Sequence, residues 1–294
     1  MTRTSQRPNT SDLTVSGRTQ VYAILGWPVT HSLSPVMQNA AFAATGIDAI
    51  YIPFPVREPE LANAVTGLRA LTICGCNITV PHKENVAKYL DRLSPEAQAI
   101  GAVNTIVRNG DRLEGHNTDA GGFLKSLHRD LGFSPSGSNV LVLGAGGAAR
   151  ACVYALAQAK ATHICVANRN SSRAESMCAE FSPLFPDTGM SSCDLDYSSL
   201  ALACSEADLI VNTTSLGLTD TAADPLPWEI INSKTLFYDV VYSSSVTPMV
   251  ARAQEYGLKA VDGLGMLIAQ GEYAFHIWTG VDPGDVMRRS LAQV

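Results

Sequence analysis

Apolar and polar positions change between two periods in the first third of the chain, which predicts strands separated by helices. Short apolar runs that end at glycine or proline are typical of strands, whereas longer segments with apolar residues three or four apart are typical of helices. Ser34 is placed to cap the first helix and Gly46 to end it. The alternation indicates a parallel or mixed sheet with helices on its faces. The predicted strands cover 20–29, 49–56 and 72–82, and the predicted helices cover 34–46, 59–71 and 83–91.

A second unit with a different pattern begins near residue 119. A helix is predicted over 120–132, followed by the linker SPSGS at 134–138. Residues 139–170 then form an apolar strand, a glycine-rich turn, a helix and another apolar strand, and further strands are predicted within 207–217 and 235–242. Nearly continuous apolar runs are expected for parallel strands that are covered on both faces. The chain is therefore predicted to be an α/β protein of two domains.

Composition and charge narrow the classes of function. The chain has 294 residues, enough for two domains, and a formal net charge of −6 at pH 7. This acidic balance favours neither nucleic acid nor an anionic membrane surface as a partner. No apolar run approaches the roughly 20 residues of a transmembrane helix, and residues 1–18 lack the apolar region of a secretory signal. We expect a flexible tail over 1–18 and a cytoplasmic protein that acts on a small molecule.

The cysteines and histidines predict no metal site. The 7 cysteines and 6 histidines are scattered without the spacing of metal ligands. Single cysteines in apolar surroundings are typical of buried, reduced thiols in a cytosolic protein.

The sequence GAGGAA at 144–149 is the clearest chemical motif. It follows a predicted strand and opens a helix, the context in which G-x-G-x-x-G/A indicates dinucleotide binding. Gly144 permits a tight turn, Gly146 lets the backbone approach a pyrophosphate, and Ala149 lets helix and strand pack closely. The N-terminus of the helix adds free N–H groups and a partial positive charge. A glycine turn without a ligand is the alternative, and the complete βαβ unit disfavours it.

The end of the next strand indicates which dinucleotide is bound. NAD-binding units usually place Asp or Glu there to hold the ribose 2′-hydroxyl. This chain has Asn168, Arg169 and Asn170 instead, with Arg173 shortly after. Guanidinium groups pair well with phosphate, so we predict NADP as the cofactor. The alternative, that an arginine here only solvates a loop, applies more to Arg173 than to Arg169.

Small polar residues gather at strand ends and turns of the first unit. Hydroxyl groups beside a helix N-terminus can hold a carboxylate, although Ser34 alone could be a simple cap. A lone lysine is more often a solvated charge than a catalyst. A catalytic role for Lys83 is therefore indicated only together with the polar residues around it. Together these side chains suit a small polyhydroxylated acid. They are Ser32, Ser34, Asn77, Thr79, Lys83, Asn104 and Asp119.

The motifs, taken in order, resemble the shikimate 5-dehydrogenase family, the NADP-dependent enzymes of aromatic amino-acid biosynthesis. The resemblance covers residues 31 to 271, nearly the whole chain apart from the tail. It rests on HSLSP, CNITVPHK, GAVNT, NTD, VLGAGGAARA, NRN, VNTTSLG, DVVY followed by TP, and GLGMLIAQG.

The resemblance implies a role for each matching position. Lys83 and Asp119 would be the catalytic pair beside the substrate oxygen that changes oxidation state. Ser32 and Ser34 would hold the substrate carboxylate. Its hydroxyls and ring face would be bound by Asn77, Thr79, Lys83, Asn104, Asp119, Tyr242 and Gln270. NADP would be bound by Gly144, Ala145, Gly146, Gly147, Ala148, Asn168, Arg169, Asn170 and Arg173, with Thr214, Val240 and Gly263 near the nicotinamide.

The resemblance also implies the domain plan and the reaction. Residues 19–118 plus 264–294 would form the substrate domain, and 119–263 a Rossmann-type NADP domain. The last segment would form two helices that return to the first domain, with Asp282 or Asp285 capping the second. The expected reaction is the reversible NADPH-dependent reduction of 3-dehydroshikimate to shikimate, in a monomer or a homodimer.

Four alternatives remain open at this point. Two are close relatives, a catabolic quinate/shikimate dehydrogenase, often NAD-dependent, and an enzyme of the aminoshikimate pathway. A non-catalytic NADP sensor would keep the glycine turn but lose turnover, and the Lys83 and Asp119 pair argues against it. A methylenetetrahydrofolate dehydrogenase fits HSLSP and NTD poorly.

Overall fold

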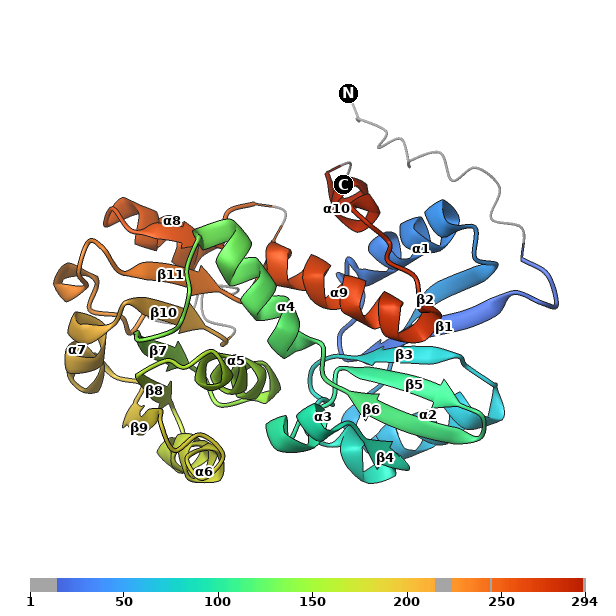
Figure 1. Cartoon of the computed structure of the whole chain (residues 1–294), viewed down its shortest axis with the longest axis horizontal. Coiled ribbons are helices and arrows are strands. Elements are labelled where there is room, and N and C mark those ends of the chain that lie inside the picture. The colour runs from blue at the N-terminus through green and yellow to red at the C-terminus, as the bar shows by residue number, and fades with distance from the viewer. Residues whose placement is uncertain (1–14, 215–223, 244, 293–294) are drawn as a thin grey trace.

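The computed structural model describes residues 15–214, 224–243 and 245–292, which form two sheets of six strands each (Figure 1). The first sheet has the strand order β2-β1-β3-β5-β6-β4. β1 is parallel to β2 and β3, whereas β5 is antiparallel to β3 and β6, so the sheet is mixed, as predicted. Its strands are β1 (Gln20–Gly26), β2 (Ala49–Pro55), β3 (Gly75–Ile78), β4 (Arg92–Leu93), β5 (Thr105–Asn109) and β6 (Arg112–His116). The accompanying helices are α1 (Ser34–Thr45), α2 (Leu61–Ala70), α3 (Pro95–Ile100) and the short 3-10 helices η1 (Glu58–Glu60) and η2 (Val86–Tyr89).

The second sheet is parallel throughout its described pairs, with the order β12-β11-β10-β7-β8-β9. The order reverses at β7, as in a doubly wound dinucleotide-binding sheet. Its strands are β7 (Asn139–Leu143), β8 (His163–Asn168), β9 (Gly189–Asp194), β10 (Leu209–Asn212), β11 (Leu236–Asp239) and β12 (Lys259–Val261). Its helices are α5 (Gly147–Gln158), α6 (Ser171–Phe181), α7 (Tyr197–Glu206), α8 (Pro248–Glu255) and the 3-10 helix η4 (Trp228–Ile230).

Two helices lie side by side between the sheets (Figure 1). They are α4 (Asp119–Ser126), which continues into a π-helix (Leu127–Leu131), and α9 (Leu264–Thr279). Lys125 of α4 and Glu272 of α9 form an ion pair of 2.8 Å between them. The last helix, α10 (Val286–Leu291), then packs on α1. The C-terminal helices therefore return to the first sheet, as expected.

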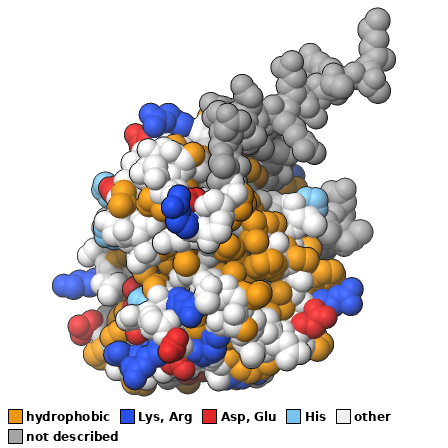
Figure 2. All heavy atoms as spheres, turned by 90° about the vertical axis from the view of Figure 1, so that its right-hand side faces the viewer, with side chains coloured by type: hydrophobic (Ala, Val, Ile, Leu, Met, Phe, Trp, Pro, Cys, Tyr) orange, Lys and Arg blue, Asp and Glu red, His pale blue; other side chains and the backbone are white. Residues whose placement is uncertain are grey.

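Each sheet is buried on both faces. Successive side chains of a strand point to opposite faces, and each face packs in its own core cluster. In β1, Ala23 and Leu25 enter one core cluster, and Tyr22 and Ile24 enter the cluster on the other face. The second sheet likewise divides its β7 residues between two clusters. This explains why the apolar runs of these strands are almost unbroken. At the end of the molecule formed by the first sheet, hydrophobic side chains also reach the surface, among charges of both signs (Figure 2).

The helix predicted over 83–91 is wrong. The segment forms a turn and then only the short 3-10 helix η2. The carbonyl of Lys83, which an α-helix would bond internally, accepts a hydrogen bond of 2.8 Å from the backbone N–H of Val103. Tertiary pairing has therefore replaced the helical hydrogen bond.

The predicted caps are also corrected in part. α1 has Leu33 at its N-cap, without a side-chain cap, and Ser34 is its first helical residue and is buried. Gly46 ends the helix in the left-handed conformation, with φ of 71°, as predicted. Asp285 occupies the N-cap of α10 but makes no capping hydrogen bond there, whereas Asp282 accepts one from the N–H of Gly284.

Candidate active site

Lys83 and Asp119 form a direct ion pair. The Lys83 Nζ donates to the Asp119 Oδ2 at 2.6 Å, and the two side chains are only 16% and 5% exposed. Lys83 lies in the turn after β3, and Asp119 is the first residue of α4. A strand end and a helix start from different parts of the chain thus place an ammonium group against a carboxylate, largely shielded from water.

The position of Asp119 is set by two amide side chains. The Asn117 Oδ1 accepts from the backbone N–H groups of Asp119 and Ala120, at 3.0 and 3.2 Å, and so satisfies two free N–H groups at the start of α4. The Asn104 Nδ2 donates to the Asp119 Oδ1 at 2.9 Å. Each carboxylate oxygen therefore has its own donor, which leaves the group little freedom to rotate.

Asn104 is the centre of a wider network and is only 2% exposed. Its Nδ2 also lies 2.9 Å from the Thr118 Oγ1 and 3.3 Å from the Gln270 Oε1. Its Oδ1 accepts from the backbone N–H of Thr118 at 2.7 Å. The network joins β5, α4 and α9, and so brings the predicted residue Gln270 to the Lys83 and Asp119 pair.

A second cluster surrounds Asn77. Tyr51 donates its hydroxyl to the Asn77 Oδ1 at 2.7 Å, and the Asn77 Nδ2 donates to the Asn104 carbonyl at 3.1 Å. Burial raises the pKa of Tyr51 well above 10.0, so it remains a hydroxyl donor, while a hydrogen bond with Ser34 acts in the opposite direction. The cluster therefore connects Ser34 to the Asn104 network.

Three further predicted residues surround the start of α1 or the end of β1. The Ser32 Oγ accepts from the N–H of Ser34 at 3.3 Å. Tyr242 lies beside the backbone of Leu33, where burial raises the pKa of its phenol and a hydrogen bond from that backbone opposes the rise. Thr79 packs its methyl group against Gly26, so it lies near this cluster without a described hydrogen bond to it.

The glycine turn lies at the carboxyl end of β7. Gly144 has φ of +107°, and a Cβ there would lie 2.6 Å from the Thr213 Oγ1, so only glycine fits. Ala145 is buried, Gly146 caps α5, and Gly147 and Ala148 open the helix. A Cβ on Gly147 would lie 3.0 Å from the Cβ of Lys83. The dinucleotide motif and the lysine of the other unit therefore touch.

Residues 168–173 begin at the carboxyl end of the next strand, β8, of which Asn168 is the last residue. Asn168 donates to the Asn170 carbonyl at 2.9 Å, and Asn170 is the N-cap of α6. Arg169 is exposed and forms no hydrogen bond or ion pair with the residues that the structure describes. Arg173, by contrast, donates from its Nη2 to both carboxylate oxygens of Glu84, each at 3.0 Å. Glu84 was not among the predicted residues.

The remaining cofactor candidates surround the ends of β10 and β11. A Cβ on Gly263 would lie 2.0 Å from the carbonyl oxygen of Val240, so these two backbones are in close contact. Thr214 donates its hydroxyl to the Asn212 Oδ1 at 2.7 Å. These residues lie at the same edge of the sheet as the glycine turn, because the carboxyl ends of parallel strands lie at one edge.

Behind them lies a buried network that the sequence reasoning missed. The Asp239 carboxylate accepts from the Asn212 Nδ2 at 2.9 Å and from the Thr247 hydroxyl at 2.7 Å. Burial raises the pKa of Asp239 to about 6 despite these hydrogen bonds. The network holds the loops after β10 and β11. Its sequence signal was an Asn and an Asp that each end an apolar strand.

Other residues missed from the sequence left weaker signals. Asn117 lies within the NTD motif itself, and its position just before the helix could have indicated a hydrogen bond to the first N–H groups of that helix. Tyr51 lies within an apolar strand, where nothing in the sequence distinguishes it from core. Glu84 follows Lys83 directly, but its partner Arg173 is remote in sequence.

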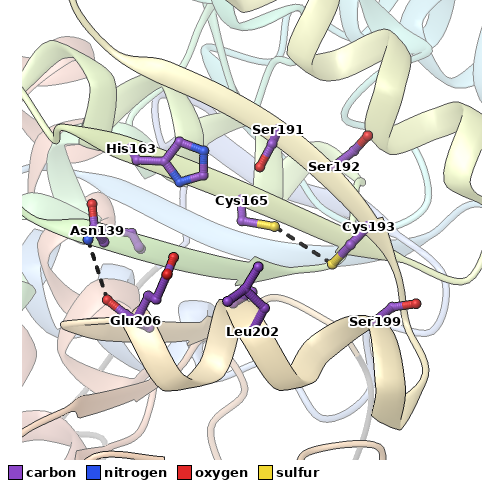
Figure 3. Close-up of a pocket in the computed structure, with 12 residues that line it drawn as sticks. Asn139, His163, Cys165, Ser191, Ser192, Cys193, Ser199, Leu202 and Glu206 are labelled. Atoms are coloured by element: carbon purple, nitrogen blue, oxygen red, sulfur yellow. Dashed lines mark hydrogen bonds between the residues drawn. The ribbon is translucent and has the colours of Figure 1, made fainter.

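A pocket of about 210 Å³ lies elsewhere on the second sheet (Figure 3). Asn139 and His163, which line it, begin β7 and β8, whereas the glycine turn and Asn168 are at the opposite ends of these strands. The Sγ atoms of Cys165 and Cys193 lie 3.7 Å apart in its wall. The pocket contains none of the predicted site residues.

The described part of the chain holds neither a cluster of metal-ligating side chains nor a membrane-spanning helix. Within 15–214, 224–243 and 245–292, no group of three or more His, Cys, Asp or Glu side chains is arranged to hold a metal ion. In the same part of the chain, no helix combines the length and apolar character needed to span a membrane. The cysteines at 74, 76, 152, 165, 178, 193 and 204 are free thiols.

Comparison with known proteins identifies the family. Profiles described as the shikimate dehydrogenase substrate binding domain, shikimate / quinate 5-dehydrogenase and the shikimate 5′-dehydrogenase C-terminal domain match residues 24–106, 127–266 and 263–291. A protein of Geobacter metallireducens named shikimate dehydrogenase (NADP(+)) is 48% identical over 95% of this chain and 98% of its own length. This chain belongs to the shikimate dehydrogenase family. The family resemblance drawn from the motifs is confirmed.

Solved members of the shikimate dehydrogenase family have the same architecture. The structure from Aquifex aeolicus has a TM-score of 0.85 and 37% identity, covering 95% of this chain and 99% of that one. The enzyme of Thermus thermophilus, solved in complex with NADP(H) and shikimate, has a TM-score of 0.81 and 37% identity, covering 94% and 100%. The predicted two-domain α/β fold is therefore confirmed.

Proposed function

We propose that this chain catalyses the reversible NADPH-dependent reduction of 3-dehydroshikimate to shikimate, in the chorismate route to aromatic amino acids. Family membership supports this activity. The observation that carries it is the contact between the two halves of the site, where Lys83, paired with Asp119, packs against Gly147 of the dinucleotide motif. A proton-handling group beside a dinucleotide turn is the arrangement that a carbonyl reductase requires.

The residues present fit NADP. Gly144 has no room for a side chain, and α5 begins at the glycine turn, so the free N–H groups at its N-terminus suit a pyrophosphate. Asn168, Arg169, Asn170 and Arg173 would hold the adenosine 2′-phosphate. Thr214, Val240 and Gly263 would border the nicotinamide. NADPH, when bound, supplies the hydride that reduces the ketone.

We assign the proton to Lys83. As the ketone is reduced, negative charge develops on its oxygen, and the Lys83 ammonium stabilises that charge and donates a proton. Asp119 holds the ammonium in place through its Oδ2, while its Oδ1 is held by Asn104. In the reverse direction Lys83 takes the proton of the alcohol. Asp119 therefore acts on the geometry of the pair as well as on its charge.

The other polar residues would orient the substrate. Ser32 and Ser34, at the start of α1, would hold the carboxylate. The hydroxyls and the ring would be contacted by a larger set in and around the Asn104 and Asn77 clusters. This set is Asn77, Thr79, Lys83, Asn104, Asp119, Tyr242 and Gln270.

We further propose the domain bounds, location and assembly of the protein. Residues 19–118 plus 264–294 would be the substrate domain and 119–263 the NADP domain, whereas most of the tail expected over 1–18 lies outside the described residues. The free thiols suit the reducing cytoplasm. The site residues proposed here come from one chain, so a monomer would suffice, whereas a homodimer could bury the hydrophobic surface of Figure 2.

The test is an initial-rate assay of purified protein that follows reduced nicotinamide by absorbance. NADP⁺ and NAD⁺ are each combined with shikimate and with quinate. We expect a strong rate only with NADP⁺ and shikimate. A preference for quinate or NAD⁺ would assign the chain to a catabolic relative and contradict the role of Arg169. NADP⁺ binding without turnover of either acid would favour a sensor.

A further inference from the structure

The ion pair between Glu84 and Arg173 joins the two halves of the molecule. Glu84 belongs to the turn that carries Lys83, and Arg173 belongs to α6, which follows the second strand of the dinucleotide unit. Both oxygens of the carboxylate are bonded by one nitrogen, the Arg173 Nη2, at 3.0 Å each. The side chains are 51% exposed for Arg173 and 39% for Glu84.

The Glu84 carboxylate is also close to the glycine turn. Its Oε1 lies 3.9 Å from the position that a Cβ on Gly146 would take. The carboxylate therefore lies between an arginine and the N-terminus of α5, two groups that both attract an anion. An anion of the protein is thus placed beside the groups proposed to receive the phosphates of the cofactor.

We propose that Glu84 is a specificity-determining residue that competes with the 2′-phosphate of NADP for Arg173. The proposal rests on the function proposed above, because it takes Arg173 as a ligand of that phosphate. The carboxylate and the phosphate are both acceptors for the same guanidinium, and the Nη2 is already directed at Glu84. NADP binding then breaks the ion pair, whereas NAD, which lacks the 2′-phosphate, leaves it in place. Glu84 thereby reduces the preference for NADP over NAD.

The experiment measures the dissociation constants of NADP⁺ and NAD⁺ by calorimetry. The quantity compared between variants is the Kd for NAD⁺ divided by the Kd for NADP⁺. Both cofactors carry the pyrophosphate, so the ratio isolates the 2′-phosphate. In Glu84→Gln the ratio should rise about two- to fivefold, the effect expected for one solvated ion pair. In Arg173→Ala the ratio should fall, and adding Glu84→Gln to Arg173→Ala should not change it further.

A matched control is available on α6, the helix that carries Arg173. Glu175→Gln removes an equal charge from α6, and Glu175 is exposed and forms no ion pair with the described residues. A ratio raised equally by Glu175→Gln would show a general charge effect and overturn the proposal. An unchanged or lower ratio in Glu84→Gln, with Arg173→Ala still lowering it, would overturn the competition alone. An unchanged ratio in Arg173→Ala would instead remove Arg173 from the proposed cofactor site.

Discussion

The two ends of the proposed site are built in opposite ways. Around Lys83 the polar groups are buried and bonded to one another, with Asn104 2% and Asp119 4% exposed. At the cofactor end, Arg169 is exposed without a described partner and Arg173 is held by a solvated carboxylate. One end is fixed before any ligand arrives, and the other can exchange partners.

The physical reason lies in the cost of leaving a polar group unpaired. A buried donor or acceptor without a partner costs about 1–3 kcal/mol, so a buried network is stable only when it is complete. An exposed guanidinium loses little when it changes partner, because water replaces the carboxylate. Proton transfer thus depends on a rigid end, and cofactor choice on an adaptable one.

The largest effect should come from the proton donor at the rigid end. Lys83→Met should lower kcat by about 10²–10⁴-fold, the contribution typical of general acid–base catalysis, while the KM for NADP⁺ changes little. Steady-state kinetics in both directions checks this. Lys88→Met, the same change at an exposed lysine of η2, is the control and should retain the rate. Near-full turnover of Lys83→Met would exclude Lys83 as the donor.

The next effect tests whether the buried network acts as a unit. Asn104→Ala removes the donor to Asp119 and the acceptor for the buried N–H of Thr118. The free energy of unfolding should fall by about 2–4 kcal/mol, as measured by urea titration. Asn85→Ala, at an exposed asparagine without a described side-chain hydrogen bond, should change it little. An equal fall in the free energy of unfolding of both variants would show that the buried Asn104 network adds no more stability than an exposed asparagine.

The third prediction concerns pH and the Asp239 network. The folded protein raises the pKa of Asp239 from 3.8 to about 6, so the folded state binds this proton more tightly than the unfolded state. Stability from this group is therefore highest below pH 3.8 and is lost as the pH rises to about 6.

Asp239→Asn cannot titrate, so its free energy of unfolding should fall less over that range, by about 3 kcal/mol. Its stability should also be lower at every pH, because an amide cannot accept all three hydrogen bonds that the carboxylate accepts from Asn212, Thr247 and the backbone N–H of Val241. Denaturant titrations at several pH values check both effects. Parallel curves for the two proteins would exclude Asp239 as the titrating group.

The smallest effect should come from the adaptable end. Arg169→Ala should raise the Kd for NADP⁺ roughly tenfold, about 1.4 kcal/mol, and leave the Kd for NAD⁺ unchanged. Arg169→Lys keeps the charge but loses the planar fork, so it should lie between the two. A parallel loss of both cofactors would mean that Arg169 supports the loop rather than the phosphate.

The same contrast explains what could be predicted from the sequence. The glycine turn and the strands around it were predictable, because the apolar runs and the position of Gly144 obey local rules. The hairpin of β5 and β6 was not predicted, although the two residues between its strands, Gly110 and Asp111, are a dipeptide typical of such turns. The helix at 83–91 failed because a hydrogen bond from Val103 overrides its local pattern.

Within the site, it was easier to predict which residues belong to it than which of them form hydrogen bonds or ion pairs with one another. The sequence motifs identified Lys83, Asp119 and Asn104 as candidates, but not that Asn104 would hold Asp119. Buried networks join residues remote in sequence, and the periodicity of apolar residues along the chain does not reveal such contacts. The partner of Arg173 was missed for the same reason, since 89 positions separate it from Glu84.

The contact between Asn104 and Gln270 has a consequence for how the protein is made. These two side chains are 166 positions apart, and α9, which carries Gln270, is the penultimate helix. During translation the strands and helices that precede α9 emerge first and can begin to fold. The amide network around Lys83 closes only after α9 has left the ribosome, so catalytic competence is among the last properties that the nascent chain acquires.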